Sequence, residues 1–107
     1  IHANASTDPN ATGTQTFYAD PGSQPFAAVV LDEVGRGTGL APRGPTQAAF
    51  KVLVDSIRVP AILVETAFIT NPREEQMLGD PGFQQSMAQS ILKGMQRYLS
   101  TPQAGAP

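Results

Sequence analysis

A short apolar run in the middle of the chain constrains the fold most strongly. Residues 60–65 have the sequence Pro-Ala-Ile-Leu-Val-Glu, and Glu65 is the only charged residue between Val59 and Ile69. A run this short and this apolar predicts a strand that is buried within a sheet. The run therefore favours a layered fold in which other elements cover that strand.

Strand and helix signals alternate along the rest of the chain. Residues 14–18 form a β-rich run after Gly13, and residues 24–34 place apolar side chains at helical spacing until Gly35 and Gly37. The sequence also predicts loops at residues 4–12 and 37–45. A further short strand is predicted at residues 50–54.

Two helix starts in the last third of the chain have their own signals. Asn71 is suited to cap a helix whose first residue is Pro72, and Asp80 begins a second helix in the same way. Within that second helix, Gly94 costs about 1 kcal/mol of helix propensity relative to Ala. Residues 82–99 are predicted to carry one long apolar face, made of Phe83, Met87, Ile91, Leu92, Met95, Tyr98 and Leu99.

This alternation predicts an α/β fold with a twisted, mostly parallel sheet flanked by helices. The predicted strands are few for a sheet that must bury residues 61–64 on both faces. We therefore expect the chain to supply the C-terminal part of a domain. Residues 1–100 form that part, and residues 101–107 form a flexible tail.

The composition argues against several functional classes. The 107 residues include 7 Lys and Arg against 9 Asp and Glu, the formal net charge is -2, and the basic residues do not cluster. This distribution argues against a nucleic-acid-binding surface. No uncharged apolar run approaches the roughly 18 residues that cross a bilayer, so no membrane span is expected. With one His and no Cys, the chain alone excludes disulfides, thiolate metal sites and metal sites with two His ligands.

Two residues are the main candidates for chemistry. Glu65 stands where the apolar strand is expected to end, and ligand crevices form at the carboxyl ends of strands in open α/β sheets. A carboxylate among apolar neighbours is suited to exchanging protons near neutral pH. The structural alternative is a strand-end Glu that faces water or pairs with Arg43 or Arg58. His2 is either a metal ligand or acid/base group, or a solvated side chain near a terminus.

Three other charged residues have weaker signals. Arg43 lies in the predicted Gly/Pro loop, where it is either an anion clamp or a solvated side chain. Glu74 and Glu75 fall in the first turn of a predicted helix, where the helix dipole stabilises negative charge. The sequence has no Gly-x-Ser-x-Gly turn and no His-Glu-x-x-His helix, which argues against a serine hydrolase and against that class of zinc peptidase.

Several segments together closely resemble one enzyme family. In chain order they are Ile1-His-Ala-Asn-Ala5, Gly13-Thr-Gln-Thr-Phe-Tyr18, Arg43-Gly44, Phe50-Lys-Val-Leu53 and Pro60-Ala-Ile-Leu-Val-Glu-Thr-Ala-Phe-Ile-Thr-Asn71, followed by the closing helix at residues 91–99. This combination resembles the C-terminal half of the zinc-dependent N-acetylmuramoyl-L-alanine amidases, which are bacterial and phage cell-wall hydrolases. The resemblance covers nearly all of the chain except the last few residues.

The resemblance implies roles for individual residues. His2 matches a zinc ligand, the last of a His, Glu, His set in chain order, and Glu65 matches the catalytic carboxylate. The first His and the Glu ligand lie upstream in that family, so we expect the N-terminal half of the same domain to be a partner of this chain. Ala67 stands where the family usually has Gly. Only a short helix and loop precede Arg43, where some members carry an autoinhibitory helical insert.

The implied function is hydrolysis of peptidoglycan at the amide between N-acetylmuramic acid and L-alanine. In the implied mechanism, zinc activates a water molecule, Glu65 moves the proton from that water to the leaving amine, and Asn4 and Arg43 position the substrate. A wall hydrolase acts outside the cytoplasm, so the expected location is periplasmic or secreted and associated with the cell wall. An activator protein is a further candidate partner. The alternative function is a non-catalytic wall-binding or interaction module derived from such a hydrolase.

Overall fold

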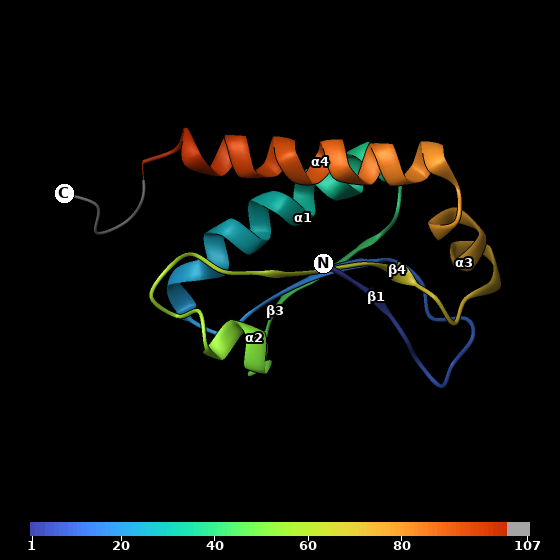
Figure 1. The fold of residues 1–107 in the computed structure, drawn as a ribbon, viewed down its shortest axis with the longest axis horizontal. Helices are drawn as coiled ribbons and strands as arrows, with labels where there is room; N and C mark the ends of the chain where they lie inside the picture. Colours follow the sequence, from blue (N-terminus) through green and yellow to red (C-terminus); the bar gives the residue numbers. More distant parts are fainter. Residues whose placement is uncertain (103–107) are drawn as a thin grey trace.

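The computed structural model describes residues 1–102, and the predicted tail at 101–107 falls mainly on residues outside this part. Figure 1 shows the arrangement of the helices and strands. Their order along the chain is β1 (His2–Asn4), β2 (Thr14–Tyr18), the 3-10 turn η1 (Pro21–Ser23), α1 (Gln24–Thr38), β3 (Pro42–Gln47), α2 (Lys51–Val54), β4 (Leu63–Phe68), α3 (Pro72–Leu78) and α4 (Pro81–Leu99).

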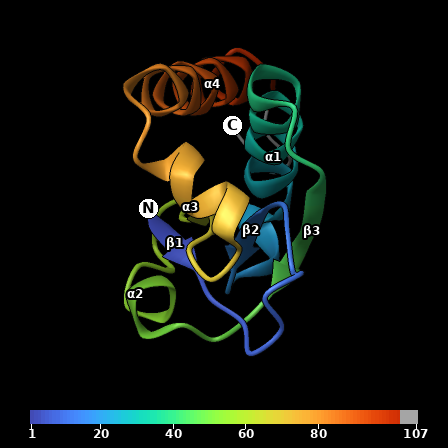
Figure 2. The same ribbon diagram turned by 90° about the vertical axis from the view of Figure 1, so that its right-hand side faces the viewer.

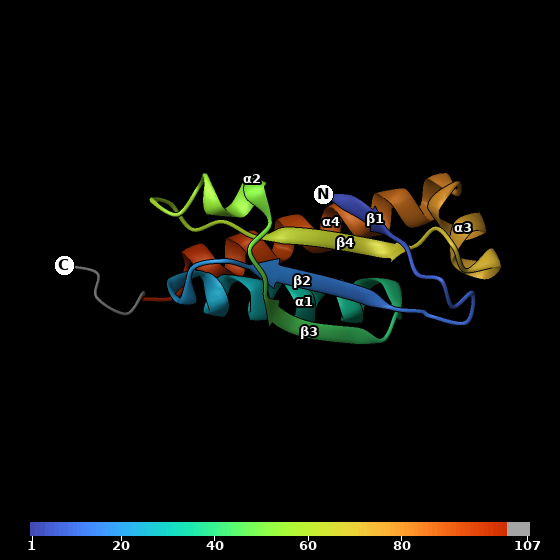
Figure 3. The same ribbon diagram turned by 90° about the horizontal axis from the view of Figure 1, so that it is seen from below.

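The described strands form one sheet in the order β1-β4-β2-β3. The β1–β4 and β2–β3 pairs are parallel, and the central β4–β2 pair is antiparallel. Figure 3 shows the strands side by side in this order. The predicted α/β class, with a mostly parallel sheet flanked by helices, is therefore confirmed.

Two helices cover one face of the sheet. In Figures 1 and 2, α1 and α4 lie side by side above the strands, whereas α2 lies on the opposite side. The buried core between helices and sheet contains Val30 and Val34 of α1, Val64 of β4 and Met87 of α4. On the other face, α2 is the one described helix that lies beside the sheet (Figure 3), although every residue of β4 is buried. We call this the open face.

A glycine allows the two covering helices to approach closely. A Cβ atom added at Gly94 would lie 2.7 Å from the Cα of Val30. Gly94 lowers the helix propensity of α4, but it allows α4 to pack closely on α1. A larger residue would prevent this packing. Along the same helix, Leu92, Met95 and Leu99 are exposed, so the prediction of one continuous apolar face is wrong for these three.

The segment between the first helix and the second half of the chain differs from its prediction. The first helix does not end at Gly35 but continues to Thr38, and Gly39 ends it with a φ of 75°. The predicted loop at residues 37–45 is wrong because β3 begins at Pro42. Proline residues are tolerated in β3 because an edge strand leaves one row of its backbone groups unpaired in the sheet.

Two predicted strand assignments also need correction. Residues 50–54 are not a strand, because Lys51–Val54 forms the short helix α2 with only Leu53 buried. Within the described residues this segment pairs with no strand, so its strand propensity has no sheet to stabilise it. The strand predicted at residues 60–65 lies instead at Leu63–Phe68, where pairing with β2 begins. Glu65 therefore lies inside β4 and not at its end.

The helix starts follow the sequence signals. The Asn71 side chain accepts hydrogen bonds from the backbone N–H groups of Arg73 and Glu74, and the Asp80 side chain accepts one from Phe83. Both caps are confirmed. Among the described residues, no helix has the length and apolar character to cross a membrane.

Candidate active site

Four polar residues form a row across the sheet. The strand register places His2 opposite Glu65, Glu65 opposite Gln15, and Gln15 opposite Arg43. Residues paired laterally in a sheet project from the same face. Three of these residues were singled out by the sequence, and the register brings them into one line with Gln15.

The row lies on the face of the sheet that α1 and α4 leave open. On β2, the Thr16 hydroxyl donates to the backbone oxygen of Ala27 in α1, so Thr16 points toward the helices. Successive residues in a strand point to opposite faces, and Gln15 therefore points away from the helices. Phe17 shares the face of Gln15 and contacts Phe50 beside α2, with ring centroids 5.0 Å apart.

Glu65 and His2 form an ion pair within the row. His2 Nδ1 lies 3.8 Å from Glu65 Oε1, with side-chain exposures of 63% for His2 and 10% for Glu65. The alternative in which Glu65 faces water or pairs with Arg43 or Arg58 is wrong, since its contact is with His2. Glu65 Oε2 is the buried side-chain atom that lacks a hydrogen-bond partner among the described residues. The carboxylate thus has one oxygen toward the imidazole and a second, buried oxygen without a partner among the described residues.

The predicted substrate residues flank this pair. The Asn4 side chain lies in the same network, because its Nδ2 donates to Gln15 Oε1 at 3.3 Å. Arg43 belongs to β3 and not to a loop, and its guanidinium lies 5.0 Å from the centroid of the Phe68 ring. Arg43 also donates to the backbone oxygen of Thr12 at 3.3 Å. The structure therefore brings Asn4 close to the centre of the row and holds Arg43 at its edge.

Glu74 lies in the first turn of α3, as the sequence predicts, and it also has a structural role that the sequence does not predict. It is 3% exposed, and its carboxylate accepts hydrogen bonds from the backbone N–H groups of Gly13 and Phe68. These bonds tie the start of β2 to the end of β4. The position after the Asn-Pro cap was the available signal, but it could not show that the carboxylate turns inward.

The strongest electrostatic cluster lies elsewhere, on the helix layer. Arg97 of α4 donates to Asp32 at 2.6 Å and to Glu33 at 3.2 Å on α1. The hydrogen bond from Arg97 lowers the pKa of Asp32, and the same bond raises the pKa of Arg97. This cluster joins two helices on the far side of the sheet from the row, so its role is structural.

Comparison with known protein families identifies the chain. A family model described as N-acetylmuramoyl-L-alanine amidase (Amidase_3) matches residues 1–97. The chain belongs to this amidase family. The resemblance deduced from the sequence motifs is thereby confirmed.

Named relatives of this amidase chain come from several bacteria. It is 44% identical to the N-acetylmuramoyl-L-alanine amidase AmiC of Neisseria meningitidis over 79 residues, which are 74% of this chain and 19% of the relative. It is 31% identical to the germination-specific amidase of Bacillus subtilis over 102 residues, which are 94% of this chain and 43% of the relative.

A solved amidase structure has the same fold. The catalytic domain of CwlV from Bacillus (Paenibacillus) polymyxa superposes with a TM-score of 0.86 at 35% identity, covering 94% of this chain and 55% of that one. The chain thus spans about half the length of that solved domain, and less than half of the two named relatives.

Side chains that could bind a metal do not cluster in the described part of this amidase chain. Among the residues that the structure describes, no group of three or more His, Cys, Asp or Glu side chains gathers at one place. The exposed His2 imidazole, next to a carboxylate oxygen without a partner, fits one ligand of a shared zinc site, because catalytic zinc generally has three protein ligands and one open position.

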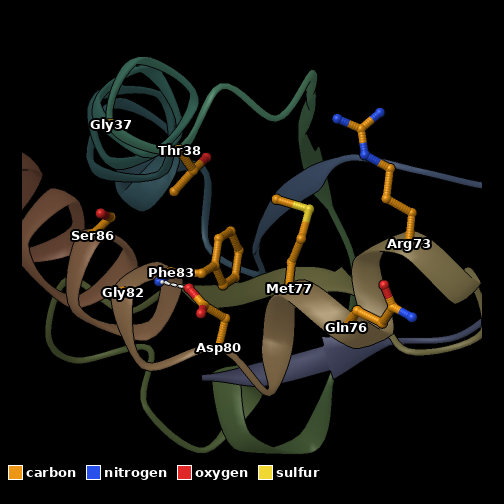
Figure 4. A pocket seen from close by; sticks show the side chains of 9 residues that line it. All are labelled: Gly37, Thr38, Arg73, Gln76, Met77, Asp80, Gly82, Phe83 and Ser86. Carbon is orange, nitrogen blue, oxygen red and sulfur yellow. Dashed lines mark hydrogen bonds between the residues drawn. The ribbon is translucent and has the colours of Figure 1, made fainter.

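A cavity of about 460 Å³ lies away from this row. Figure 4 shows it between α1, α3 and the start of α4. The carboxylate of Asp80, which lines it, is engaged as the cap of α4 through Phe83. Neither His2 nor Glu65 lines this cavity, so we place the candidate active site on the open face of the sheet.

Proposed function

We propose that this chain forms the C-terminal half of an amidase catalytic domain that hydrolyses peptidoglycan. The bond cleaved is the amide between N-acetylmuramic acid and the L-alanine of the stem peptide. The observation that carries this proposal is the contact between His2 and Glu65 on an open sheet face, in a chain of the amidase family. The site acts outside the cytoplasm, in the periplasm or at the cell wall, where its polymeric substrate is found.

His2 is the residue of this chain that would hold zinc, and the other ligands would come from the N-terminal half of the domain. When bound, zinc supplies Lewis-acid polarisation of the scissile carbonyl and of a water molecule. The exposed His2 side chain is accessible to such a partner. This division explains why the chain carries one imidazole and no second one.

Glu65 is the proposed general base and acid. Its Oε1 faces His2 Nδ1, whereas its Oε2 lacks a protein partner among the described residues. In the proposed reaction, the Glu65 carboxylate accepts a proton from water and then delivers it to the leaving amine of L-alanine. A positioned carboxylate of this kind typically accelerates proton transfer by about 10²–10⁴-fold.

Asn4 and Arg43 are the proposed substrate-binding residues. Asn4 lies on the same side of Glu65 as His2 and is linked to β2 by its amide, so it can orient the stem peptide. Arg43 is exposed and stacked against Phe68, which holds a cation where a carboxylate of the peptide can bind.

The test uses the complete gene product that contains this chain, purified without chelator. We expect about one zinc per polypeptide and release of new L-alanine amino termini from purified cell walls. His2→Ala is expected to lose both zinc and activity. Stoichiometric zinc in His2→Ala would remove His2 from the site, and wall binding without hydrolysis by the zinc-loaded wild type would favour the non-catalytic module.

A further inference from the structure

Gln15 occupies a position in the row that has no assigned role. It faces Glu65 across the β2–β4 pair, on the side of Glu65 opposite to His2. Adjacent strands lie about 4.8 Å apart, so Gln15 stands one strand spacing from the proposed general base. Gln15 is partly exposed.

Hydrogen bonds hold the Gln15 side chain on both sides. Gln15 Oε1 accepts from Asn4 Nδ2 on β1, and Gln15 Nε2 donates to Thr46 Oγ1 on β3, both at 3.3 Å. The bond to Asn4 crosses β4, which lies between β1 and β2 in the sheet. The link therefore joins side chains of two strands that are not neighbours in the sheet.

The two bonds leave half of the Gln15 amide available. A primary amide has two N–H donors and two acceptor lone pairs, and Gln15 uses one of each. One N–H and one lone pair remain, which matches the acceptor and donor of a peptide group. Consecutive residues of a peptide are 3.8 Å apart, close to the strand spacing. A peptide whose scissile amide lies over Glu65 therefore brings its next peptide group within reach of Gln15.

We propose that Gln15 is a substrate-binding residue that recognises the first peptide group of the stem peptide beyond the scissile amide. This inference rests on the proposed function. It makes Gln15 a specificity determinant, since a ligand that ends at L-alanine lacks the group that Gln15 binds. The Asn4–Gln15 link keeps the Gln15 amide oriented before the ligand arrives.

The test compares two ligands on zinc-loaded Glu65→Gln protein, which binds without turnover. The ligands are N-acetylmuramoyl-L-alanine and N-acetylmuramoyl-L-alanyl-D-isoglutamine, and the latter alone has the second peptide group. We expect Gln15→Ala to weaken binding of the longer ligand by about two- to tenfold, as for one net hydrogen bond. Binding of the shorter ligand is expected to stay unchanged. Calorimetry measures both dissociation constants.

Gln47→Ala is the matched control. Gln47 is an exposed glutamine of β3 whose Nε2 donates to the backbone oxygen of Ala19, away from the row. The Gln47→Ala variant should bind both ligands with unchanged dissociation constants. If Gln15→Ala does not fold, Gln15→Met keeps the side-chain length without the amide and serves the same comparison.

Three results would overturn the inference. They are an unchanged affinity of Gln15→Ala for the longer ligand, an equal loss for both ligands, and a parent protein that binds neither. The proposed function is tested separately by hydrolysis with the wild type. An active wild type whose Gln15→Ala variant shows no ligand-dependent loss would overturn this inference alone.

Discussion

Two buried carboxylates, one on each side of the sheet, differ in how many of their oxygens have a partner. On the helix side, Glu33 of α1 is 6% exposed and lies 3.2 Å from Arg97 and 3.8 Å from Lys93. On the open side, Glu65 is 7% exposed, yet one of its oxygens has no partner among the described residues. A buried carboxylate without a full set of partners costs stability, so the fold retains it at a cost that packing does not explain.

This contrast separates structural from chemical roles. The helix-facing side of β2 and β4 presents small or apolar groups, including Thr14 and Thr16 with no exposed surface and Val64 in the core. The open side presents side chains that can bind a ligand, in a line set by strand register. Changes on the helix face should therefore alter stability, whereas changes in the row should alter activity.

The largest expected effect comes from Glu65→Gln. Removing a general base should lower wall hydrolysis by about 10²–10⁴-fold, while the neutral amide keeps the shape of the side chain. Zinc content and thermal stability should stay close to the wild type. Hydrolysis assays on the complete gene product, together with a circular dichroism melt, measure both quantities.

Glu33→Gln is the opposing variant for this comparison. It should lower the melting temperature, because Arg97 and Lys93 lose a charged partner, and leave activity per folded molecule unchanged. Glu65→Gln with activity within a few-fold of wild type would remove Glu65 from the mechanism.

Gly94→Ala tests whether close packing of α4 on α1 stabilises the helix layer. Helix propensity alone favours alanine, but the new Cβ would lie 2.7 Å from the Cα of Val30. We expect a net loss of about 1–3 kcal/mol in the free energy of unfolding, as for other overpacked cores. Denaturant titration measures the difference from wild type.

Gly35→Ala in α1 is the matched control, because its new Cβ would lie at an ordinary contact distance of 3.5 Å from the backbone oxygen of Leu40. It should gain up to about 1 kcal/mol of helix propensity. If Gly94→Ala stabilises the protein as Gly35→Ala does, close packing of α4 on α1 does not require glycine at position 94.

Glu74→Gln tests the link beneath the active-site strands. In Glu74, Oε1 accepts from both Phe68 and Gly13, and Oε2 accepts the shorter bond from Gly13. A glutamine replaces Oε2 by an NH₂ donor, so the Gly13 N–H keeps only the longer, 3.2 Å bond. The expected cost is about 1–3 kcal/mol in unfolding free energy, measured by denaturant titration. Glu75→Gln, at an exposed neighbour, should cost much less, and equal costs would contradict the anchoring role of Glu74.

Asp32→Asn should have the smallest effect. The Arg97 hydrogen bond lowers the pKa of Asp32 below its ordinary value of 3.8 in the folded chain. The stabilisation is therefore present above that ordinary value and is lost as the pH falls through the lower, folded value. We expect a slight, salt-sensitive fall in melting temperature near neutral pH that disappears in strong acid. A difference that persists in strong acid would contradict this origin.

Local sequence signals determined several parts of this protein. Asn71 and Asp80 cap the helices they were predicted to cap, because a cap depends only on residues within one turn. The strand at Thr14–Tyr18 was predicted correctly, and the motifs around His2 and Glu65 pointed to the amidase family that the family model confirms. The proposed chemical roles of those two residues follow from the same motifs.

Tertiary structure alone decided the remaining features. Lys51–Val54 is a helix, Pro42–Gln47 is a strand and Glu74 turns inward, because each outcome depends on partners distant in sequence. The same holds for the row, since the register that brings Gln15 to Glu65 joins residues 50 positions apart. Sequence identified the groups capable of chemistry, whereas strand pairing determined which of them stand side by side, because pairing is a long-range choice that no local pattern encodes.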